Sequence, residues 1–289
     1  MRHLWIATLA LLLLSLASAQ GRAQEGVVFE KDIEYTNPDN QHLQLNLARP
    51  EKGDGPFPAI LCIHGGGFRA GTRDGYDSLV KQLAARGYVA VTVDYRLAPK
   101  YPFPAAIHDV KAAVRWLRAN AAKYHINPER IGVTGGSAGG HLALYLGVTG
   151  GVKELEGDGG NPTQSSKVNC VVNFYGPSDL TRSYGKSVDA AEVLPLFLGG
   201  NVEKERPKHL LASPLYWVNP LAPPTLCVHG TKDNYVAYEQ SIWMVDRLLA
   251  AGVEAELVTL QGAGHGFGGE QAKQADTALF AFFDKYLKR

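Results

Sequence analysis

The chain has 289 residues, 45% of them hydrophobic and 20% charged, which fits one large α/β domain or two small ones with a sizeable core. Its formal charge is +1, from 29 Lys and Arg against 28 Asp and Glu. This balance excludes the strongly basic surface typical of nucleic-acid-binding proteins and provides no net attraction to an acidic membrane.

The N-terminal segment differs in composition from the rest. A basic start precedes an apolar run over residues 4–14, and the small residues "ASA" follow at 17–19. This layout is typical of a secretory signal peptide, and the run is shorter than the roughly 20 residues that a membrane span needs. We predict a signal peptide at 1–19, one folded domain at 20–289, a secreted or periplasmic protein, and no stable membrane insertion after signal removal.

Strands and helices alternate along the rest of the chain. The apolar patterns predict strands at residues 27–36, 42–50, 57–67, 88–99, 129–137, 167–176, 223–230 and 254–260. They predict helices at 75–87, 103–125, 138–148, 238–252 and 274–289. The first two strands form a half-exposed antiparallel hairpin. The remainder predicts an α/β fold with a mostly parallel sheet covered on both faces, and such sheets place their sites beyond the carboxyl ends of the strands.

The three cysteines, Cys62, Cys170 and Cys227, each lie inside an apolar strand-like run. This placement favours small buried side chains over a disulfide framework, although a pair between neighbouring strands stays open. No histidines, cysteines or carboxylates have the spacing of metal ligands, so no metal site is predicted.

Residues 177–222 interrupt the alternation with prolines and aromatics but no clear strand. Long connections inside a compact domain are often functional, so we predict a small excursion over the sheet edge that forms a short lid or pocket wall. Trp217 in this segment, and Phe68 earlier in the chain, are predicted to bind substrate. Ordinary packing is the alternative for both.

"GGSAG" at residues 135–139 fits the pattern G-x-S-x-G between a predicted strand and a predicted helix. A sharp turn there exposes the serine hydroxyl, and the helix N-terminus provides N–H groups and a positive dipole end beside it. The pattern alone arises by chance in glycine-rich loops, so the strand and helix around it carry the argument. We predict that Ser137 is a nucleophile.

"HGGGF" at residues 64–68 closes an earlier strand. Acyl transfer needs N–H donors aimed at the oxygen that becomes negative, and glycines let the backbone face a pocket. We predict that the oxyanion is held by the backbone of Gly66, Gly67 and Ala138. A phosphate-binding loop is the weaker alternative, because no G-x-G-x-x-G or Lys-Ser/Thr pattern accompanies these glycines. His64 is predicted to hold the loop by hydrogen bonding.

A serine nucleophile needs a base, and the base needs an orienting acid. His265 follows a predicted strand in "GAGHGF" and comes after Ser137 in the chain. The order Ser, Asp, His places the acid between them. We prefer Asp233, which follows the preceding strand; Asp179, after an earlier strand, is the alternative.

"HGGGF", "DYRLAP", "GGSAGGH", "HGTKDNYV" and "GAGHGF" occur in an order that resembles the α/β-hydrolase superfamily. The chain is most similar to carboxylesterases of the hormone-sensitive-lipase type and the related bacterial esterase/lipase and feruloyl-esterase-like group, over roughly residues 27–287. The resemblance implies an α/β-hydrolase catalytic domain with Ser137 as nucleophile, His265 as base and Asp233 as orienting acid. It implies no cofactor.

The same resemblance implies structural roles for Asp94 and Arg96, which would brace a strand end near the pocket. Two features depart from the hormone-sensitive-lipase pattern. Gly136 stands where those enzymes usually have an acidic residue, with His141 after the following glycines, and the chain lacks their longer N-terminal helical cap. Both departures favour the feruloyl-esterase-like branch and argue against long acyl chains.

These expectations describe a secreted serine carboxylester hydrolase for short-chain or aryl esters, with acetyl or feruloyl esters of plant polysaccharides as candidate substrates. The expected partner is a small-molecule or polysaccharide-linked ester; the oligomeric state stays open. Alternatives are a general short-chain esterase or lipase without polysaccharide preference, and an arylformamidase-like amidase with the same triad. A non-catalytic binding protein on the same scaffold would be expected to lack a triad member.

Overall fold

The computed structural model describes residues 26–183 and 188–288. Eight strands form one sheet in the order β1-β2-β4-β3-β5-β6-β7-β8. They are β1 Val27–Thr36, β2 Leu43–Pro50, β3 Phe57–Ile63, β4 Val89–Val93, β5 Ile126–Gly136, β6 Cys170–Phe174, β7 Thr225–Gly230 and β8 Ala255–Leu260. β2 is antiparallel to β1 and β4, and the other neighbours are parallel. The predicted mostly parallel sheet with an N-terminal antiparallel hairpin is confirmed.

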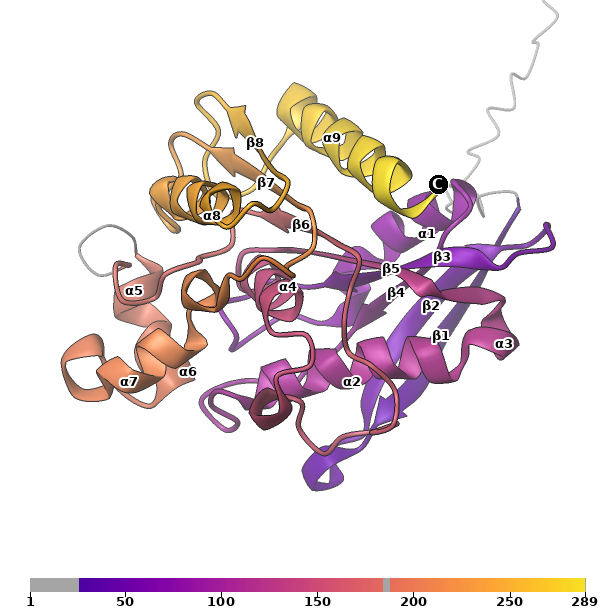
Figure 1. Cartoon of the computed structure of the whole chain (residues 1–289), viewed down its shortest axis with the longest axis horizontal. Coiled ribbons are helices and arrows are strands. Elements are labelled where there is room, and N and C mark those ends of the chain that lie inside the picture. The colour runs from indigo at the N-terminus through magenta and orange to yellow at the C-terminus, as the bar shows by residue number, and fades with distance from the viewer. Residues whose placement is uncertain (1–25, 184–187, 289) are drawn as a thin grey trace, which may run out of the picture.

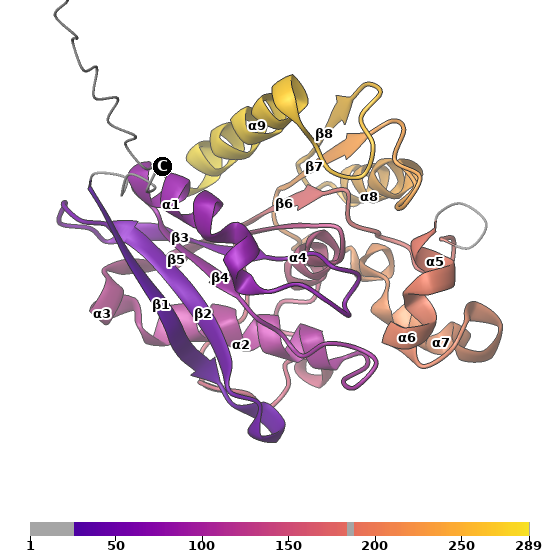
Figure 2. The ribbon, with the colours of Figure 1, turned by 180° about the vertical axis from the view of Figure 1, so that it is seen from behind.

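Helices cover both faces of this sheet (Figures 1 and 2). They are α1 Asp77–Ala85, α2 Ala105–Ala119, α3 Ala121–Tyr124, α4 Ala138–Val148, α5 Asp189–Glu192, α6 Leu194–Leu198, α7 Val202–Ala212, α8 Glu239–Ala250 and α9 Gly269–Leu287. Short 3-10 helices are η1 Pro38–Asn40, η2 Arg73–Tyr76, η3 Lys153–Leu155 and η4 Pro214–Trp217. In both views α1 and α9 lie together on one side of the sheet and α2 on the other.

Two hydrophobic clusters form the core, one on each face. β3 shows the alternation that separates them: Leu61 and Ile63 belong to the cluster with α2, α4 and α8, whereas Ile60 and Cys62 belong to the cluster with α1 and α9. A strand with both faces covered is apolar throughout, which explains the unbroken apolar runs in the sequence. All three cysteines are buried here as free thiols.

The parallel strands end along one edge of the sheet, and five successive strands in the sheet order carry the site there. The turns that follow β3, β5, β6, β7 and β8 hold the HGGGF segment, Ser137, Tyr175, Asp233 and His265 respectively. These residues span 202 positions of the sequence, from His64 to His265. They meet because the carboxyl ends of parallel strands lie along the same edge of the sheet.

The helical segment predicted over residues 103–125 is divided in the structure. α2 ends at Ala119, and α3 follows as a single turn. At the end of α2 the Trp116 carbonyl oxygen accepts both the Asn120 backbone N–H, at 3.0 Å, and the Asn120 side-chain amide, at 2.9 Å.

The predicted excursion at residues 177–222 contains α5, α6, α7 and η4, which extend beside the β6 to β8 end of the sheet (Figure 1). The predicted signal peptide lies outside the described residues. Within the described ranges, no helix has both the length and the apolarity to cross a membrane.

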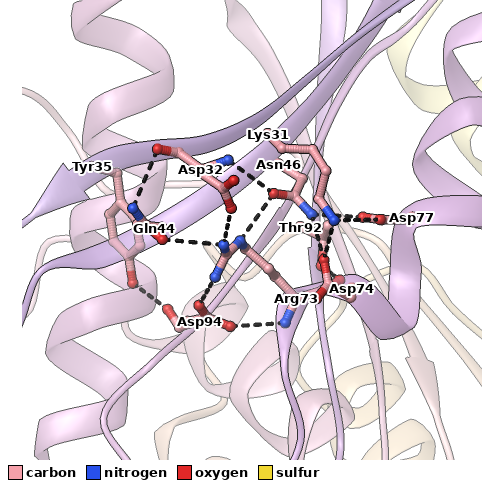
Figure 3. Close-up of polar contacts among 10 residues, drawn as sticks. All are labelled: Lys31, Asp32, Tyr35, Gln44, Asn46, Arg73, Asp74, Asp77, Thr92 and Asp94. Carbon is pink, nitrogen blue, oxygen red and sulfur yellow. Dashed lines mark hydrogen bonds and ion pairs between the residues drawn. The ribbon is translucent and has the colours of Figure 1, made fainter.

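A polar network ties η2 to the N-terminal hairpin and to β4 (Figure 3). The Arg73 guanidinium forms ion pairs with Asp32 and Asp94, and its Nε donates to the Asn46 side-chain oxygen at 2.9 Å. The Arg73 backbone N–H also donates to Asp94 Oδ1 at 2.8 Å. Since Asn46 is fully buried, the bond from Arg73 Nε satisfies a side-chain oxygen that water does not reach.

The network also supports an irregular position in β1. Asp32 has a φ of 60° at a shift in the pairing register with β2, so its N–H lies outside the regular ladder. That N–H donates to Asn46 Oδ1 at 3.2 Å, and Asn46 Nδ2 donates to Asp77 at the start of α1 at 2.8 Å. The buried Asn46 side chain in β2 therefore links the bulge in β1 to the start of α1, and Arg73 of η2 bonds to the same amide.

We expect Arg73→Met to lower the free energy of unfolding by about 1–3 kcal/mol, because Asn46 and Asp94 each lose a partner in a partly buried setting. Urea denaturation measures this change. Lys31→Met is the matched control, since Lys31 pairs with Asp74 at an exposed position and its removal is expected to have a smaller effect. Equal losses in the two variants would contradict a stabilising role for the buried part of the network.

Candidate active site

Ser137 lies on the turn between β5 and α4 with φ 57° and ψ −121°. A non-glycine residue rarely adopts positive φ, and such strain persists where the surroundings enforce it. Here the Ser137 N–H donates to the Phe174 carbonyl oxygen at 2.9 Å, and the Ser137 carbonyl accepts from the His141 N–H at 3.0 Å. The two bonds fix the turn, so its side chain projects from the carboxyl edge of the sheet.

The glycines around Ser137 are required by close backbone packing. A Cβ at Gly139 would come within 2.0 Å of the Ile63 carbonyl oxygen at the end of β3. A Cβ at Gly135 would come within 2.4 Å of the backbone of Gly139. Any side chain at these positions would separate the serine turn from the segment that follows β3.

His265 connects the serine to a carboxylate. Its Nδ1 lies 2.8 Å from Asp233 Oδ2, and its Nε2 lies 2.9 Å from Ser137 Oγ. An ionised carboxylate only accepts, so Nδ1 carries the proton and Nε2 is left to accept the serine hydroxyl proton. The structure thus brings together the three residues that the sequence predicted to form a triad.

Asp233 is buried, and its second oxygen accepts the N–H groups of Tyr235 and Val236, each at 2.9 Å. Burial raises the pKa of Asp233, but hydrogen bonds from His229, His265 and the Val236 backbone outweigh it and hold that pKa well below its usual value. A carboxylate held ionised in this way favours the protonated form of His265 during proton transfer.

His229, at the end of β7, supplies a further donor to Asp233. Its Nε2 lies 3.0 Å from the Val236 carbonyl oxygen and 3.2 Å from Asp233 Oδ2. A carbonyl oxygen only accepts, so Nε2 carries a proton that both oxygens share. Nδ1 lies 2.8 Å from Ser241 Oγ, which fixes the ring in a fully buried position. The sequence pattern "HGTKD" placed His229 four residues before Asp233, but only the contacts show it on the carboxylate.

Asp179, the alternative acid, lies elsewhere. Its carboxylate accepts from the Thr181 hydroxyl at 2.6 Å and from the Tyr216 hydroxyl at 3.0 Å, and it pairs with Arg182 at 3.2 Å. It therefore orients part of the excursion, while Asp233 is the carboxylate on His265.

The segment after β3 faces Ser137 across a cavity of about 660 Å³ that includes Gly66 and Gly67 in its lining. Gly66 has φ 105° and Gly67 φ 61°, and a Cβ at Gly66 would come within 2.1 Å of the Ala70 carbonyl oxygen. In the described part of the chain, no backbone carbonyl accepts the N–H of Gly66, Gly67 or Ala138. These three N–H groups remain the proposed oxyanion donors.

His64 supports this segment from within. Its Nδ1 lies 2.7 Å from the Gly65 carbonyl oxygen, and its ring stacks on Tyr95 at 4.4 Å. The Tyr95 hydroxyl donates to the His64 carbonyl oxygen at 3.0 Å. Burial lowers the pKa of His64, so the ring stays neutral, which fits the predicted structural role.

The two side chains predicted to bind substrate are not in the lining of this cavity, which corrects that expectation. Phe68 is only 2% exposed, and its ring stacks on Phe197 with centroids 3.9 Å apart. Trp217 lines a separate apolar pocket with Phe103, and its indole donates to the Leu211 carbonyl oxygen at 2.8 Å. A large aromatic ring next to a site gains more from core packing than from contact with solvent.

The described residues of the excursion support the site from behind and do not form the wall of this cavity. None of its described residues is in the cavity lining, but Val193 would meet a Cβ at Gly67 at 3.1 Å, and Phe197 packs on Phe68. Glu192 pairs with Arg69 at 3.5 Å. These described residues of the excursion therefore support the HGGGF segment.

The sequence analysis missed three tyrosines in the cavity lining: Tyr76 from η2, Tyr175 after β6 and Tyr235 after β7. Tyr175 and Tyr235 pack against the His265 ring at 4.7 and 5.0 Å between centroids. Tyr175 also has a positive φ of 42°. Its position directly after a buried strand was the only signal in the sequence.

In the described ranges, no cluster of three or more His, Cys, Asp or Glu side chains is arranged to hold a metal ion. Comparison with known protein families gives a match to BD-FAE over residues 45–248.

The chain belongs to the BD-FAE family. It is an α/β-hydrolase of the hormone-sensitive-lipase and feruloyl-esterase-like group, so the resemblance predicted from its motifs is confirmed. The matched range includes the serine turn and Asp233, and His265 lies after its end.

Among curated relatives, Esterase LipC of Mycobacterium tuberculosis is 34% identical over 73% of this chain and 53% of its own length. The chain spans about half the length of the curated relatives it matches. A truncated carbohydrate esterase from gut microbiota has a similar structure, with a TM-score of 0.82 and 29% identity over 92% of this chain and 99% of that one. Thermogutta terrifontis esterase 2, phosphonylated by sarin, has a TM-score of 0.78 and 28% identity over 89% and 94%.

The structure shows why this chain has a glycine, Gly136, directly before Ser137. A Cβ at Gly136 would lie 3.0 Å from the Tyr76 hydroxyl and 3.1 Å from the Tyr175 hydroxyl. The two phenols thus occupy the space in which an acidic side chain would begin. His141 packs behind the turn, where burial lowers its pKa to about 4, and its Nδ1 lies 2.9 Å from the Pro177 carbonyl oxygen.

We expect His229→Leu to lower kcat by about 10–100-fold, because Asp233 loses one of the hydrogen bonds that hold its carboxylate in line with His265 Nδ1. With one donor lost, the Asp233 charge is less compensated and stabilises the protonated His265 more strongly. Catalysis needs the neutral ring, so the acid limb of the pH–rate profile should move to higher pH.

His229→Gln is the matched variant, because its amide offers an N–H at a similar distance from the backbone and should restore part of kcat and of the pH profile. A loss of kcat in His229→Leu with an unmoved acid limb would show that His229 acts only through packing. Thermal unfolding of both variants separates that outcome from loss of the fold.

Proposed function

We propose that this chain is a serine carboxylic ester hydrolase that works through an acyl-enzyme. The observation that carries the proposal is the continuous chain of hydrogen bonds from Ser137 through His265 to Asp233, opening into a cavity lined by the glycines after β3. Its membership of the BD-FAE family and its similarity to proteins named esterases support this proposal.

In the first step, His265 Nε2 takes the Ser137 proton as Oγ attacks the ester carbonyl carbon. The carbonyl oxygen becomes an oxyanion, which the N–H groups of Gly66, Gly67 and Ala138 are placed to hold. His265 then gives its proton to the leaving alcohol oxygen as the ester C–O bond breaks, and the acyl group remains on Ser137.

In the second step, a water molecule gives a proton to His265 and attacks the acyl carbon. The tetrahedral intermediate collapses, the bond from the carbonyl carbon to Oγ breaks, and His265 returns the proton to Ser137. Asp233 stays ionised throughout, because hydrogen bonds from His229, His265 and the Val236 backbone keep the pKa of its carboxyl low. Its role is to orient His265 and to stabilise the ring when it is charged.

The proposed substrates are short-chain or aryl esters, with acyl groups on plant polysaccharides as candidates. The cavity opens beside Ser137, and none of its described lining residues is a leucine, isoleucine, valine or methionine, so a long acyl chain would meet no long aliphatic side chain there. One structural neighbour is named a carbohydrate esterase, which supports a polysaccharide-linked ester over a lipid. Secretion through an N-terminal signal peptide would place the enzyme with such substrates, and it remains part of the proposal.

A fluorophosphonate probe tests the mechanism directly. We expect a covalent adduct on Ser137 in the folded protein, with none in Ser137→Ala, and a loss of at least about 10⁴-fold in kcat in that variant. Intact-mass and peptide mass spectrometry locate the adduct. A folded wild-type protein that gains no adduct would contradict the enzyme proposal and favour a non-catalytic binding protein.

A panel of nitrophenyl esters of rising chain length, with acetylated xylan, methyl ferulate and an aryl formamide, tests the substrate class. We expect kcat/KM to fall as the acyl chain lengthens, because the described cavity lining includes no long aliphatic side chain. Cleavage of long-chain esters alone would contradict the short-chain assignment, and preferential cleavage of the formamide would favour the amidase alternative.

A further inference from the structure

Two phenol hydroxyls converge beside the nucleophile. The Tyr76 and Tyr175 oxygens both lie within about 3 Å of the point where a Gly136 Cβ would stand, one residue from Ser137. Two hydroxyls so placed are close enough together for one ligand oxygen to hydrogen-bond to both. Both side chains line the cavity that contains Ser137 and His265.

These hydroxyls are neutral and available. Burial raises the pKa of Tyr76 and of Tyr175, so each remains a phenol that can both donate and accept. In the described ranges, no side chain hydrogen-bonds to either hydroxyl; Tyr76 has a hydrogen bond only with the Gly136 backbone. A purely apolar substrate group packed against these two hydroxyls would leave the hydroxyls without hydrogen-bond partners, and this cost disfavours the binding of such a group.

The position of Tyr175 indicates which part of the substrate meets the pair. Its ring packs edge-to-face on His265, the group that must protonate the leaving alcohol. The alcohol part of the ester therefore passes on this side, while the oxyanion donors at Gly66 and Gly67 lie on the segment after β3. The hydroxyl of a hydroxycinnamoyl group is separated from the ester carbon by a ring and a double bond, too far away to reach a pair adjoining Ser137.

Both tyrosines are held in place by the fold. Tyr76 ends η2, which the Arg73 network attaches to the hairpin and β4. The Tyr175 N–H donates to the Val228 carbonyl oxygen at 3.0 Å, and its ring also packs on Phe267 at 5.0 Å. A preorganised pair gains selectivity because little freedom is lost when a ligand binds.

We propose that Tyr76 and Tyr175 form a specificity-determining pair that hydrogen-bonds to a hydroxyl vicinal to the ester, on the alcohol part of the substrate. The enzyme would then select esters of polyols and sugars over esters of simple alcohols. This inference rests on the proposed esterase activity and names the class of alcohol that the same site accepts.

The test compares trans-2-hydroxycyclohexyl acetate with cyclohexyl acetate, which differ only in the vicinal hydroxyl. We expect wild-type kcat/KM to favour the hydroxy ester by at least about tenfold, since a site built to bind a hydroxyl discriminates against its absence. The double variant Tyr76→Phe/Tyr175→Phe keeps both rings and should bring the ratio of the two kcat/KM values towards one, whatever its overall rate. Tyr216→Phe removes a phenol hydroxyl outside this cavity and should leave the ratio unchanged.

A wild-type ratio near one, or an unchanged ratio in the double variant, would overturn the role of the pair while leaving esterase activity intact. Hydrolysis of neither ester, with no probe adduct on Ser137, would instead overturn the proposed function and this inference with it. The wild-type ratio needs no variant, so the test does not depend on how the substitutions affect folding.

Discussion

Backbone contact between the end of β3 and the start of α4 is the constraint on which the site depends. The Ile63 carbonyl oxygen occupies the space of a Cβ at Gly139, so the serine turn and the HGGGF segment touch through main-chain atoms. Without that contact, Ser137 and the N–H groups of Gly66 and Gly67 would stand apart by the width of a side chain. Acyl transfer needs the nucleophile and the oxyanion donors around a single carbonyl group, so glycine is required by geometry at these positions.

The remaining parts of the site are joined to this contact by hydrogen bonds and aromatic packing. His229 holds Asp233, Asp233 holds His265, and Tyr175 and Tyr235 pack against the His265 ring. The Arg73 network (Figure 3) holds η2, and η2 ends at Tyr76. The N-terminal hairpin, distant in sequence from the serine, thus supports one wall of the cavity.

Much of the fold was predictable because local patterns report burial directly. Apolar runs identified the strands, and strand–helix alternation predicted the parallel sheet. The predicted roles of Phe68 and Trp217 failed for a physical reason: a sequence shows that an aromatic residue is near a site, but not whether its ring faces the cavity or the core. Both rings found partners in packed aromatic and apolar surroundings. Tyr76 and Tyr175 were overlooked because nothing in the local sequence distinguishes a tyrosine that faces a cavity from one that packs in the core.

The sequence by itself determined the chemical groups and their order: a serine on a glycine-flanked turn, a glycine-rich segment after an earlier strand, and an acid and a histidine after later ones. These are local properties, set by residue type and by the strand or helix beside each residue. Only the tertiary structure decided that Asp233 rather than Asp179 holds His265, that His229 shares the carboxylate, and that two tyrosine hydroxyls meet at Gly136. Each of these depends on which strand ends lie side by side, and strand order is a property of the whole sheet.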